Sequence, residues 1–200
     1  SKLRIDSDKA TALCTTVVNN VLVPEFRARG KNVDVDDLAL DLLVSMSAVP
    51  DTYKAWRSVV NDAFLEPRFF ALPLHAASRW AKIVTSWLAS DRERLIELIT
   101  RVTSTTGNIF ASREADNIAR VLNIRRLSFA IFAGGRDAYL LHLPLIQEKL
   151  VEILRSAPAE IVQAEVYMCM RVLLFRFTSQ HLSGFWPIIV TELLRIFDQV

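Results

Sequence analysis

Apolar residues recur at intervals of three and four positions along most of the chain, and the pattern is clearest in residues 168–197. That stretch reads as an apolar helix, a short polar turn and a second apolar helix. Ser183 can cap the second helix, and Pro187 falls in its first turn, where a missing N–H is tolerated. The apolar positions beyond it share one broad face: Ile188, Ile189, Leu193, Leu194, Ile196 and Phe197. The pattern predicts a helical hairpin that packs between neighbouring layers.

The same hairpin pattern occurs immediately upstream. A gap-free shift of 43 residues places Pro144 on Pro187 and sets apolar positions on apolar positions in both helices. Two-helix repeats with a period near 40–47 residues are typical of HEAT and armadillo proteins. Two copies can also match by chance, since amphipathic helices share their spacing. We expect residues 113–156 and 157–200 to be repeat units that superpose.

Helix-breaking residues divide the remainder of the chain. A first helix is expected from residue 7 to about Val23, ended by Pro24. A later helix begins at Ser112, and Gly134–Gly135 is expected to end it in the left-handed conformation common at helix ends. No segment shows sustained strand alternation. The sequence predicts one all-α domain over residues 1–200, a HEAT- or armadillo-like α-solenoid of roughly nine or ten helices.

Composition narrows the class of protein. Apolar residues make up 52% of the chain, and the net charge of +2 is too small to require a nucleic-acid partner. Cys14 and Cys169 lie inside helical patterns and read as small buried thiols in a reducing compartment. No signal peptide is evident, and the longest charge-free run, 177–191, is too short and polar to span a bilayer. We expect a C-terminal piece of a much larger protein.

Catalytic chemistry is not indicated. His75, His142 and His181 each lack a second ligand at helical spacing, and no nucleophile or phosphate-binding motif occurs. The acidic run at 34–37 lacks the glycine and distal glutamate of an EF-hand loop, so helix capping is the better explanation. Trp80 and Trp87, one heptad apart, are expected in the core rather than in a partner groove. We expect no enzyme, no cofactor and no metal site.

Positive charge is concentrated in two places. Four arginines without an intervening acid occupy one helix and its end: Arg120, Arg125, Arg126 and Arg136. A second basic loop holds Arg27, Arg29 and Lys31. Solvated surface is the ordinary explanation, and the alternative is contact with an anionic lipid headgroup or an acidic partner. Convergence of Arg126 and Arg136 at the helix end would create a site for a headgroup phosphate.

Arg125 raises a separate question, because it shares a helix stripe with four apolar residues expected in the core: Ile118, Leu122, Phe129 and Phe132. A charge on a buried face must be paired. Arg125 could bind a carboxylate such as Asp137 or Glu165, or it could line a concave groove. Neighbouring helix residues diverge by about 100°, so we expect one of Arg125 and Arg126 to point outward and the other inward.

The run MCMRVLLFRFTSQHLSGFWPIIVTELLRIF resembles the C-terminal region of the Dopey family, large eukaryotic proteins of Golgi and endosome traffic. The likeness is densest from Arg171 to Phe197, and it rests on core-type residues: Phe185, Trp186, Pro187 and Leu193. We expect Trp186 in particular to be buried.

The resemblance implies a cytosolic protein attached peripherally to the trans-Golgi network and endosomes. It implies a large partner related to Arf exchange factors, a phospholipid flippase, phosphatidylinositol 4-phosphate membranes and, in animals, kinesin-1 bound through other regions. Three hypotheses follow for the domain itself: a scaffold that binds partner proteins, a phosphoinositide-binding module, and a homotypic assembly domain in which 183–197 is partly exposed.

Overall fold

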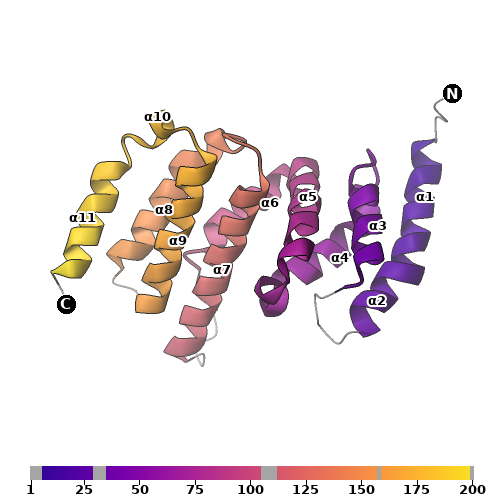
Figure 1. Ribbon diagram of the computed structural model, residues 1–200, viewed down its shortest axis with the longest axis horizontal. Coiled ribbons are helices and arrows are strands. Elements are labelled where there is room, and N and C mark those ends of the chain that lie inside the picture. The colour runs from indigo at the N-terminus through magenta and orange to yellow at the C-terminus, as the bar shows by residue number, and fades with distance from the viewer. Residues whose placement is uncertain (1–5, 29–34, 105–111, 157–158, 199–200) are drawn as a thin grey trace. The chain divides into compact units, whose positions relative to one another are not determined.

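The computed structural model describes residues 6–28, 35–104, 112–156 and 159–198, and every regular element within them is a helix (Figure 1). These ranges hold eleven α-helices, of which α1 and α2 are continuous through a π-helical segment and α10 is a single turn. The prediction of an all-α chain is confirmed. The contacts divide the chain into two compact units, residues 1–92 and 93–200.

The first unit begins with α1 (Ser7–Val17), the π-helical segment η1 (Val18–Leu22) and α2 (Val23–Ala28). Pro24 was expected to end this helix, and that prediction is wrong. In a regular α-helix the proline ring would collide with the carbonyl four residues earlier. The wider turns of η1, where Val23 N–H bonds to Val18 O, allow the chain to continue through Pro24.

The rest of the first unit is α3 (Asp37–Ser47), α4 (Tyr53–Leu65), the 3₁₀ turn η2 (Pro67–Ala71) and α5 (Leu74–Ser90). Asp36 caps α3, because its carboxylate accepts the Leu38 N–H at 2.8 Å. This confirms the capping interpretation for Asp36, whereas Asp34 lies outside the described residues.

Aromatic rings fill the core of this unit. Phe64 packs edge-on against Phe69 and Trp87, with centroids 5.0 and 5.6 Å away, and Phe69 meets Trp80 at 5.2 Å. Trp80 and Trp87 are almost fully buried, which confirms their expected place in the core. Edge-to-face contacts of this kind add to the stabilisation from burial alone.

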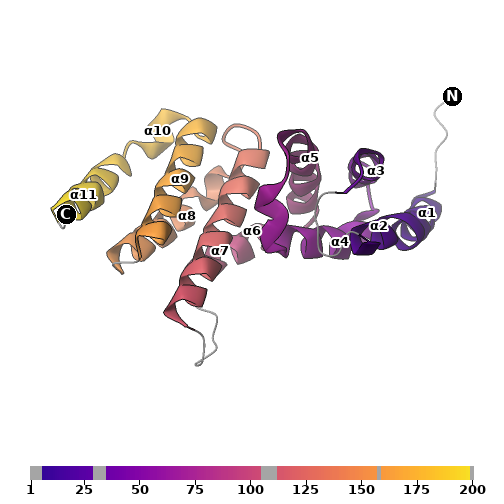
Figure 2. The same ribbon diagram turned by 60° about the horizontal axis from the view of Figure 1, so that its bottom comes forward.

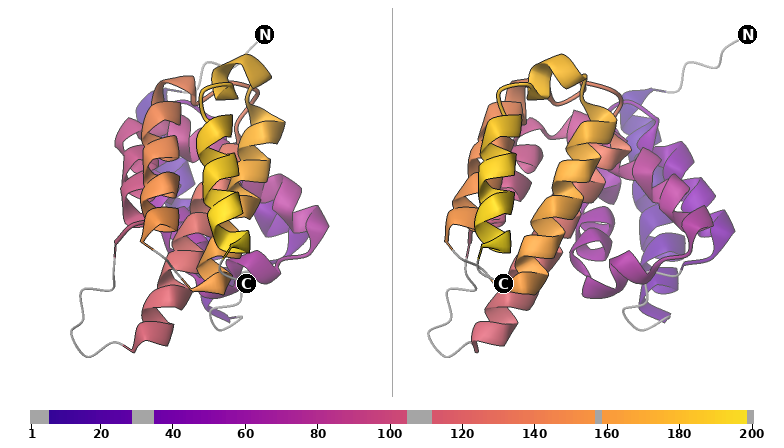
Figure 3. Two further views of the ribbon diagram at one scale, coloured as in Figure 1. Left: turned by 90° about the vertical axis from the view of Figure 1, so that its left-hand side faces the viewer. Right: turned by 60° about the vertical axis from the view of Figure 1, so that its left-hand side comes forward.

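The second unit contains α6 (Arg92–Arg101), α7 (Arg113–Ala133), η3 (Leu140–His142), α8 (Leu143–Arg155), α9 (Glu160–Arg176), α10 (Ser179–Leu182) and α11 (Trp186–Phe197). Ser112 caps α7 as expected, accepting the Ala115 N–H. Two views show α7 and α9 side by side and running in the same direction (Figures 1 and 2). Helix α8 packs against both α9 and α11, and Figure 3 shows α11 at the end of this unit.

Element boundaries in the second unit follow the 43-residue shift. Helices α8 and α11 begin at Leu143 and Trp186, and α7 and α9 end at Ala133 and Arg176. Each pair is 43 residues apart. Superposition of the two hairpins, and a solenoid built from them, stay predictions.

Helix α7 ends at Gly134, but the conformation of this glycine differs from the one predicted. Its φ of −66° is not left-handed, so the expectation of a left-handed glycine is wrong. Instead, a Cβ at Gly134 would collide with the ring of Tyr139, which folds back over the helix end. The left-handed residue of this loop is Asp137, with φ 56°. Aspartate tolerates that conformation better than most side chains.

Candidate functional site: the outer face of α7 and α9

Large apolar side chains are exposed along one line of α7 and one line of α9. On α9 these are Ile161, Met168 and Phe175, seven residues apart, and on α7 they are Ile118 and Phe132, fourteen residues apart with Arg125 midway. Seven residues make about two helical turns, so each set lies along one line of its helix. We call this surface the α7/α9 face: Ile118, Arg125, Phe132, Ile161, Glu165, Met168, Arg171 and Phe175.

The α7 stripe that the sequence predicted to face the core is therefore partly exposed to solvent. Ile118 and Phe132 are exposed, and Leu122 and Phe129 are half-buried. The buried positions are instead Val121, Ile124, Arg126, Leu127, Ala130 and Ile131. Apolar residues occur on several sides of α7, so periodicity alone did not select the correct face.

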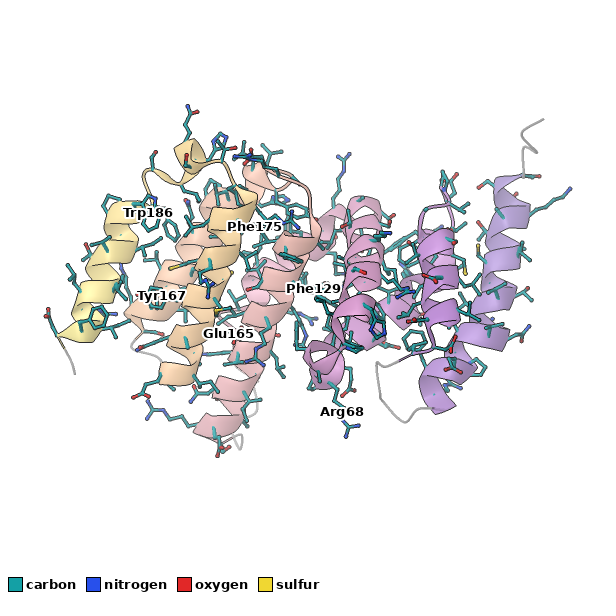
Figure 4. The ribbon with its side chains drawn as sticks, viewed as in Figure 1. Arg68, Phe129, Glu165, Tyr167, Phe175 and Trp186 are labelled. Carbon is teal, nitrogen blue, oxygen red and sulfur yellow. The ribbon has the colours of Figure 1, made fainter. Side chains whose placement is uncertain are left out.

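Two phenylalanines and an arginine form a stack at the C-terminal ends of α7 and α9. The rings of Phe132 and Phe175 are nearly parallel, with centroids 6.1 Å apart and an interplanar angle of 21°. The Arg176 guanidinium carbon lies 4.7 Å from the Phe132 centroid and 5.0 Å from that of Phe175. Phe132 remains 44% and Phe175 67% exposed, and Figure 4 shows Phe175 near the end of α9. The stack is a cationic aromatic surface open to solvent.

Arg125 and Glu165 form an ion pair across the middle of the face. Arg125 Nε donates to Glu165 Oε2 at 2.9 Å. The Glu165 side chain is 14% exposed and that of Arg125 is 43% exposed, so the pair is only partly shielded from water. Pairing with Glu165 was one of the alternatives that the sequence left open for Arg125. The pair is neutral as a unit and joins the two helices.

Asp137 ties the loop after α7 to the end of α9. Its carboxylate oxygens accept the Thr178 backbone N–H at 2.8 Å and the Thr178 hydroxyl at 2.5 Å, while its own N–H donates to Arg176 O at 2.9 Å. The hydroxyl bond first, and then the N–H bond, hold the pKa of Asp137 below its usual value. This contact positions the backbone beside the aromatic stack.

The four arginines proposed as a lipid site have separate environments. Arg126 is 8% exposed, and its Nη1 donates to Asn123 Oδ1 at 2.9 Å. Arg120 is half-buried, Arg125 is paired with Glu165, and Arg136 is exposed. Arg126 faces the interior while Arg136 is exposed, so the structure gives no support to a shared phosphate site at the helix end, and lipid binding by these arginines stays a prediction. The inward–outward expectation for residues 125 and 126 is confirmed, with Arg126 inward.

The second basic loop is described only in part. Arg27 is exposed in the last turn of α2, and Arg29 and Lys31 lie outside the described residues. No cluster of His, Cys, Asp and Glu within the described ranges could hold a metal ion. In the same ranges, no helix reaches the length and apolarity needed to cross a bilayer.

Comparison with known proteins identifies the lineage. The sequence profile described as DOP1 C-terminal matches residues 1–200. The chain belongs to the Dopey (DOP1) family. It is 34% identical over 199 residues to Protein DOP1 homolog of Drosophila melanogaster, covering 98% of this chain and 8% of that protein.

Two further Dopey proteins show similar levels of identity to this chain. Protein DOP1B of Mus musculus is 35% identical over 177 residues, which cover 88% of this chain and 7% of the mouse protein. Protein dop1 of Emericella nidulans is 32% identical over 201 residues, covering 94% of this chain and 11% of the fungal one. The chain thus spans about a tenth or less of the relatives it matches. No solved structure matches it.

The Dopey-like motif at 185–193 is only partly core. Phe185 is buried, whereas Trp186 is 43% and Leu193 36% exposed, and Pro187 is also exposed. The expectation of a buried Trp186 is wrong. Helix α11 buries Ile189 and Glu192 toward its neighbours, and no described helix covers its other apolar side. The exposed stripe of α11 is Trp186, Val190, Leu193, Leu194 and Phe197.

Glu192 is a buried charged residue of this Dopey domain that the sequence analysis did not single out. Its side chain is 8% exposed and lies 3.3 Å from Arg155 Nε and 2.9 Å from Arg195 Nη2. Burial and the nearby Glu192 carboxylate raise the pKa of Tyr167. Arg155 also lines an open groove of about 530 Å³, whose other lining residues include Val151, Phe185 and Ile188. The signal available in the sequence was a carboxylate inside an otherwise apolar helix face.

Proposed function

We propose that this Dopey domain is a non-catalytic scaffold of Golgi and endosome membrane traffic that binds partner proteins through its C-terminal helices. The observation that carries the proposal is the exposure of large apolar side chains on α9 and α11, among them Phe175 at 67% and Phe197 at 65%. Soluble monomers rarely expose contiguous apolar patches beyond a few hundred Å². Such surfaces are usual where another protein binds.

Family membership supports the trafficking part of this proposal. The partners we propose for the whole protein are a large protein related to Arf exchange factors and a phospholipid flippase. Kinesin-1 would bind through other regions. The protein would act from the cytosolic side of the trans-Golgi network and endosomes as a peripheral component.

The test uses the full-length protein in its own cells. Phe175→Asp and Leu194→Asp place charges at two exposed apolar positions and leave the buried core intact. The matched control is Leu74→Asp, at an 88% exposed leucine of the first unit. The proposal expects normal abundance in all three, with loss of co-precipitation of the exchange-factor-like partner or the flippase only in the first two. Retention of both partners by Phe175→Asp and Leu194→Asp would contradict it.

A second candidate function is homotypic assembly through α11. Trp186, Val190, Leu193 and Phe197 are spaced four, three and four residues apart, the spacing of a coiled-coil seam, and all are at least 36% exposed. Sedimentation of the 200-residue chain at increasing concentration tests this. A concentration-dependent dimer that Leu193→Ser removes would favour assembly, and a monomer throughout would reject it.

Phosphoinositide binding remains the weaker alternative. Of the four arginines considered for a lipid site, Arg126 is buried, Arg125 is paired with Glu165, and only Arg136 is exposed. Flotation with vesicles that contain phosphatidylinositol 4-phosphate, compared with phosphatidylcholine vesicles, tests the alternative directly.

A further inference from the structure

We propose that the stack of Phe132, Phe175 and Arg176 is the docking site of an acidic segment of a partner protein, which inserts an aromatic or aliphatic anchor residue. This inference rests on the scaffold function proposed above and specifies where and what the scaffold binds. Three features of the described residues support it: exposed rings, a fixed guanidinium and an excess of positive charge.

The rings provide the apolar contact. Phe132 and Phe175 come from two helices whose ends are joined through Asp137 and Thr178, so their relative position is set by the fold. Both are far more exposed than the core aromatics of the first unit, where Trp56, Phe64 and Phe69 are at most 2% exposed. An anchor residue that covers these rings would remove their apolar surface from water, which favours binding.

The guanidinium provides directional recognition. Contact with both rings restrains the Arg176 guanidinium, and among the described residues its buried Nε has no hydrogen-bond acceptor. A guanidinium restrained in this way is pre-organised to bind a carboxylate, since less side-chain entropy is lost on binding. Arg171, five residues earlier on α9, is exposed, and its Nη1 lies 3.6 Å from the Met168 sulfur.

The charge around the stack favours an acidic occupant. Segments 125–142 and 168–185 contain five arginines and a single carboxylate, Asp137. Glu165, just outside these segments, pairs with Arg125. Asp137 balances one of the other arginines, because its pKa is lowered by the Thr178 hydrogen bonds and also by the nearby charge of Arg136. The two segments still hold more arginines than carboxylates, which leaves a net positive charge at this end of the helices. Carboxylates spaced along a peptide match cations spaced along α9 better than one phosphate does.

A random-peptide library displayed on phage and selected on the 200-residue chain tests the proposal. Selected peptides are resynthesised, and their affinities are measured for the wild type and for the variants F132S/F175S and R176Q. Two matched controls remove similar groups elsewhere. L38S removes an apolar side chain of α3 that is 78% exposed, and R57Q removes an arginine whose guanidinium carbon lies 5.9 Å from the Tyr53 ring centroid. Circular dichroism establishes that every variant remains folded.

The expected peptides are rich in Asp and Glu and contain one large apolar residue. Their affinity should fall about tenfold or more in F132S/F175S and several-fold in R176Q, because truncated aromatic and arginine contacts dominate such interfaces. The controls should bind within about twofold of wild type, since residues outside an interface rarely contribute. Replacement of the peptide acids by lysine should abolish binding.

Other outcomes separate the two proposals. Peptides that bind F132S/F175S as well as wild type, or that are no more acidic than the library, overturn this docking site but leave the scaffold function standing. If no peptide is selected and only vesicles with phosphatidylinositol 4-phosphate bind, in a manner dependent on Phe175, the site is a membrane contact and both proposals fail. If neither peptides nor vesicles bind, both fail as well.

Discussion

The Asp137 carboxylate accepts hydrogen bonds from both donors of Thr178, the backbone N–H at 2.8 Å and the hydroxyl at 2.5 Å. The contact joins the loop after α7 to the residue that follows α9, and Asp137 adopts the left-handed conformation to make it. The aromatic stack lies beside this tie, because Asp137 N–H also bonds to the carbonyl of Arg176. Asp137 thus adds a polar tie between two consecutive hairpins that also meet through the Arg125–Glu165 pair and the ring stack.

This tie predicts a specific pH dependence of stability. The Thr178 hydroxyl and N–H hold the pKa of Asp137 below its usual value, which is about 3.9 in the unfolded chain. The ionised Asp137 carboxylate therefore stabilises the folded state fully above its pKa in the unfolded chain. This stabilisation is lost as the pH falls through the pKa of Asp137 in the folded protein. Asp137→Asn should lower the thermal midpoint at neutral pH, and the difference from wild type should shrink toward pH 3. A constant difference across that range, or equal behaviour of the exposed control Asp198→Asn, would contradict the assignment.

Gly134 and Gly135 offer a matched pair of substitutions. A Cβ at Gly134 would collide with the Tyr139 ring, whereas a Cβ at Gly135 meets nothing within 4 Å. We expect Gly134→Ala to cost about 1–3 kcal/mol, the usual range for overpacking. Gly135→Ala should stay within about 0.5 kcal/mol of wild type, as is normal for surface changes. Urea denaturation measures both, and equal midpoints for the two variants would show that Tyr139 does not restrict position 134.

Tryptophan fluorescence can test the exposure of α11. Trp56, Trp80 and Trp87 are at most 1% exposed, and Trp186 is 43% exposed. Iodide, a charged quencher that does not enter protein cores, should therefore reach one of the four indoles. Trp186→Phe should remove the quenchable fraction while the midpoint of unfolding changes little. A quenchable fraction that survives this substitution would mean that another tryptophan is open to solvent.

Cys169 should be chemically inert in the folded protein. Burial raises the pKa of its thiol to about 11. Only about one thiol in a thousand is then ionised at pH 8, and the thiolate is the reactive form. In a Cys14→Ser background, iodoacetamide should label Cys169 only after denaturant is added. Rapid labelling of the native protein at pH 8 would show that this part of α9 opens readily.

Much of the fold was accessible from local sequence signals. The helix start at Ser112, helix capping by the acidic run that holds Asp36, and the core positions of Trp80 and Trp87 were predicted, because each depends on a few neighbouring positions. Glu165 was one of two carboxylates suggested as the partner of Arg125, because a charge on an apolar stripe needs a counter-ion.

The errors concern which side of a helix meets its neighbours. On α7 the sequence placed Ile118 and Phe132 inward, and on α11 it placed Trp186 inward, yet all three are exposed. Both helices carry more apolar residues than one packing face can cover, and only tertiary contacts decide which are buried. The stack of Phe132, Phe175 and Arg176 depends on the approach of two helices, so no local motif could have predicted it.

Radical footprinting of side chains in the full-length protein tests the central claim that the α7/α9 face is covered by a partner. The modification rates of Phe132, Met168 and Phe175 are compared between the purified protein and the assembly isolated from cells, with Trp186 reporting on α11. The account predicts that Phe132 and Phe175 react readily alone and are protected several-fold in the assembly, as expected for interface aromatics. Equal reactivity of both phenylalanines in the two samples would contradict it.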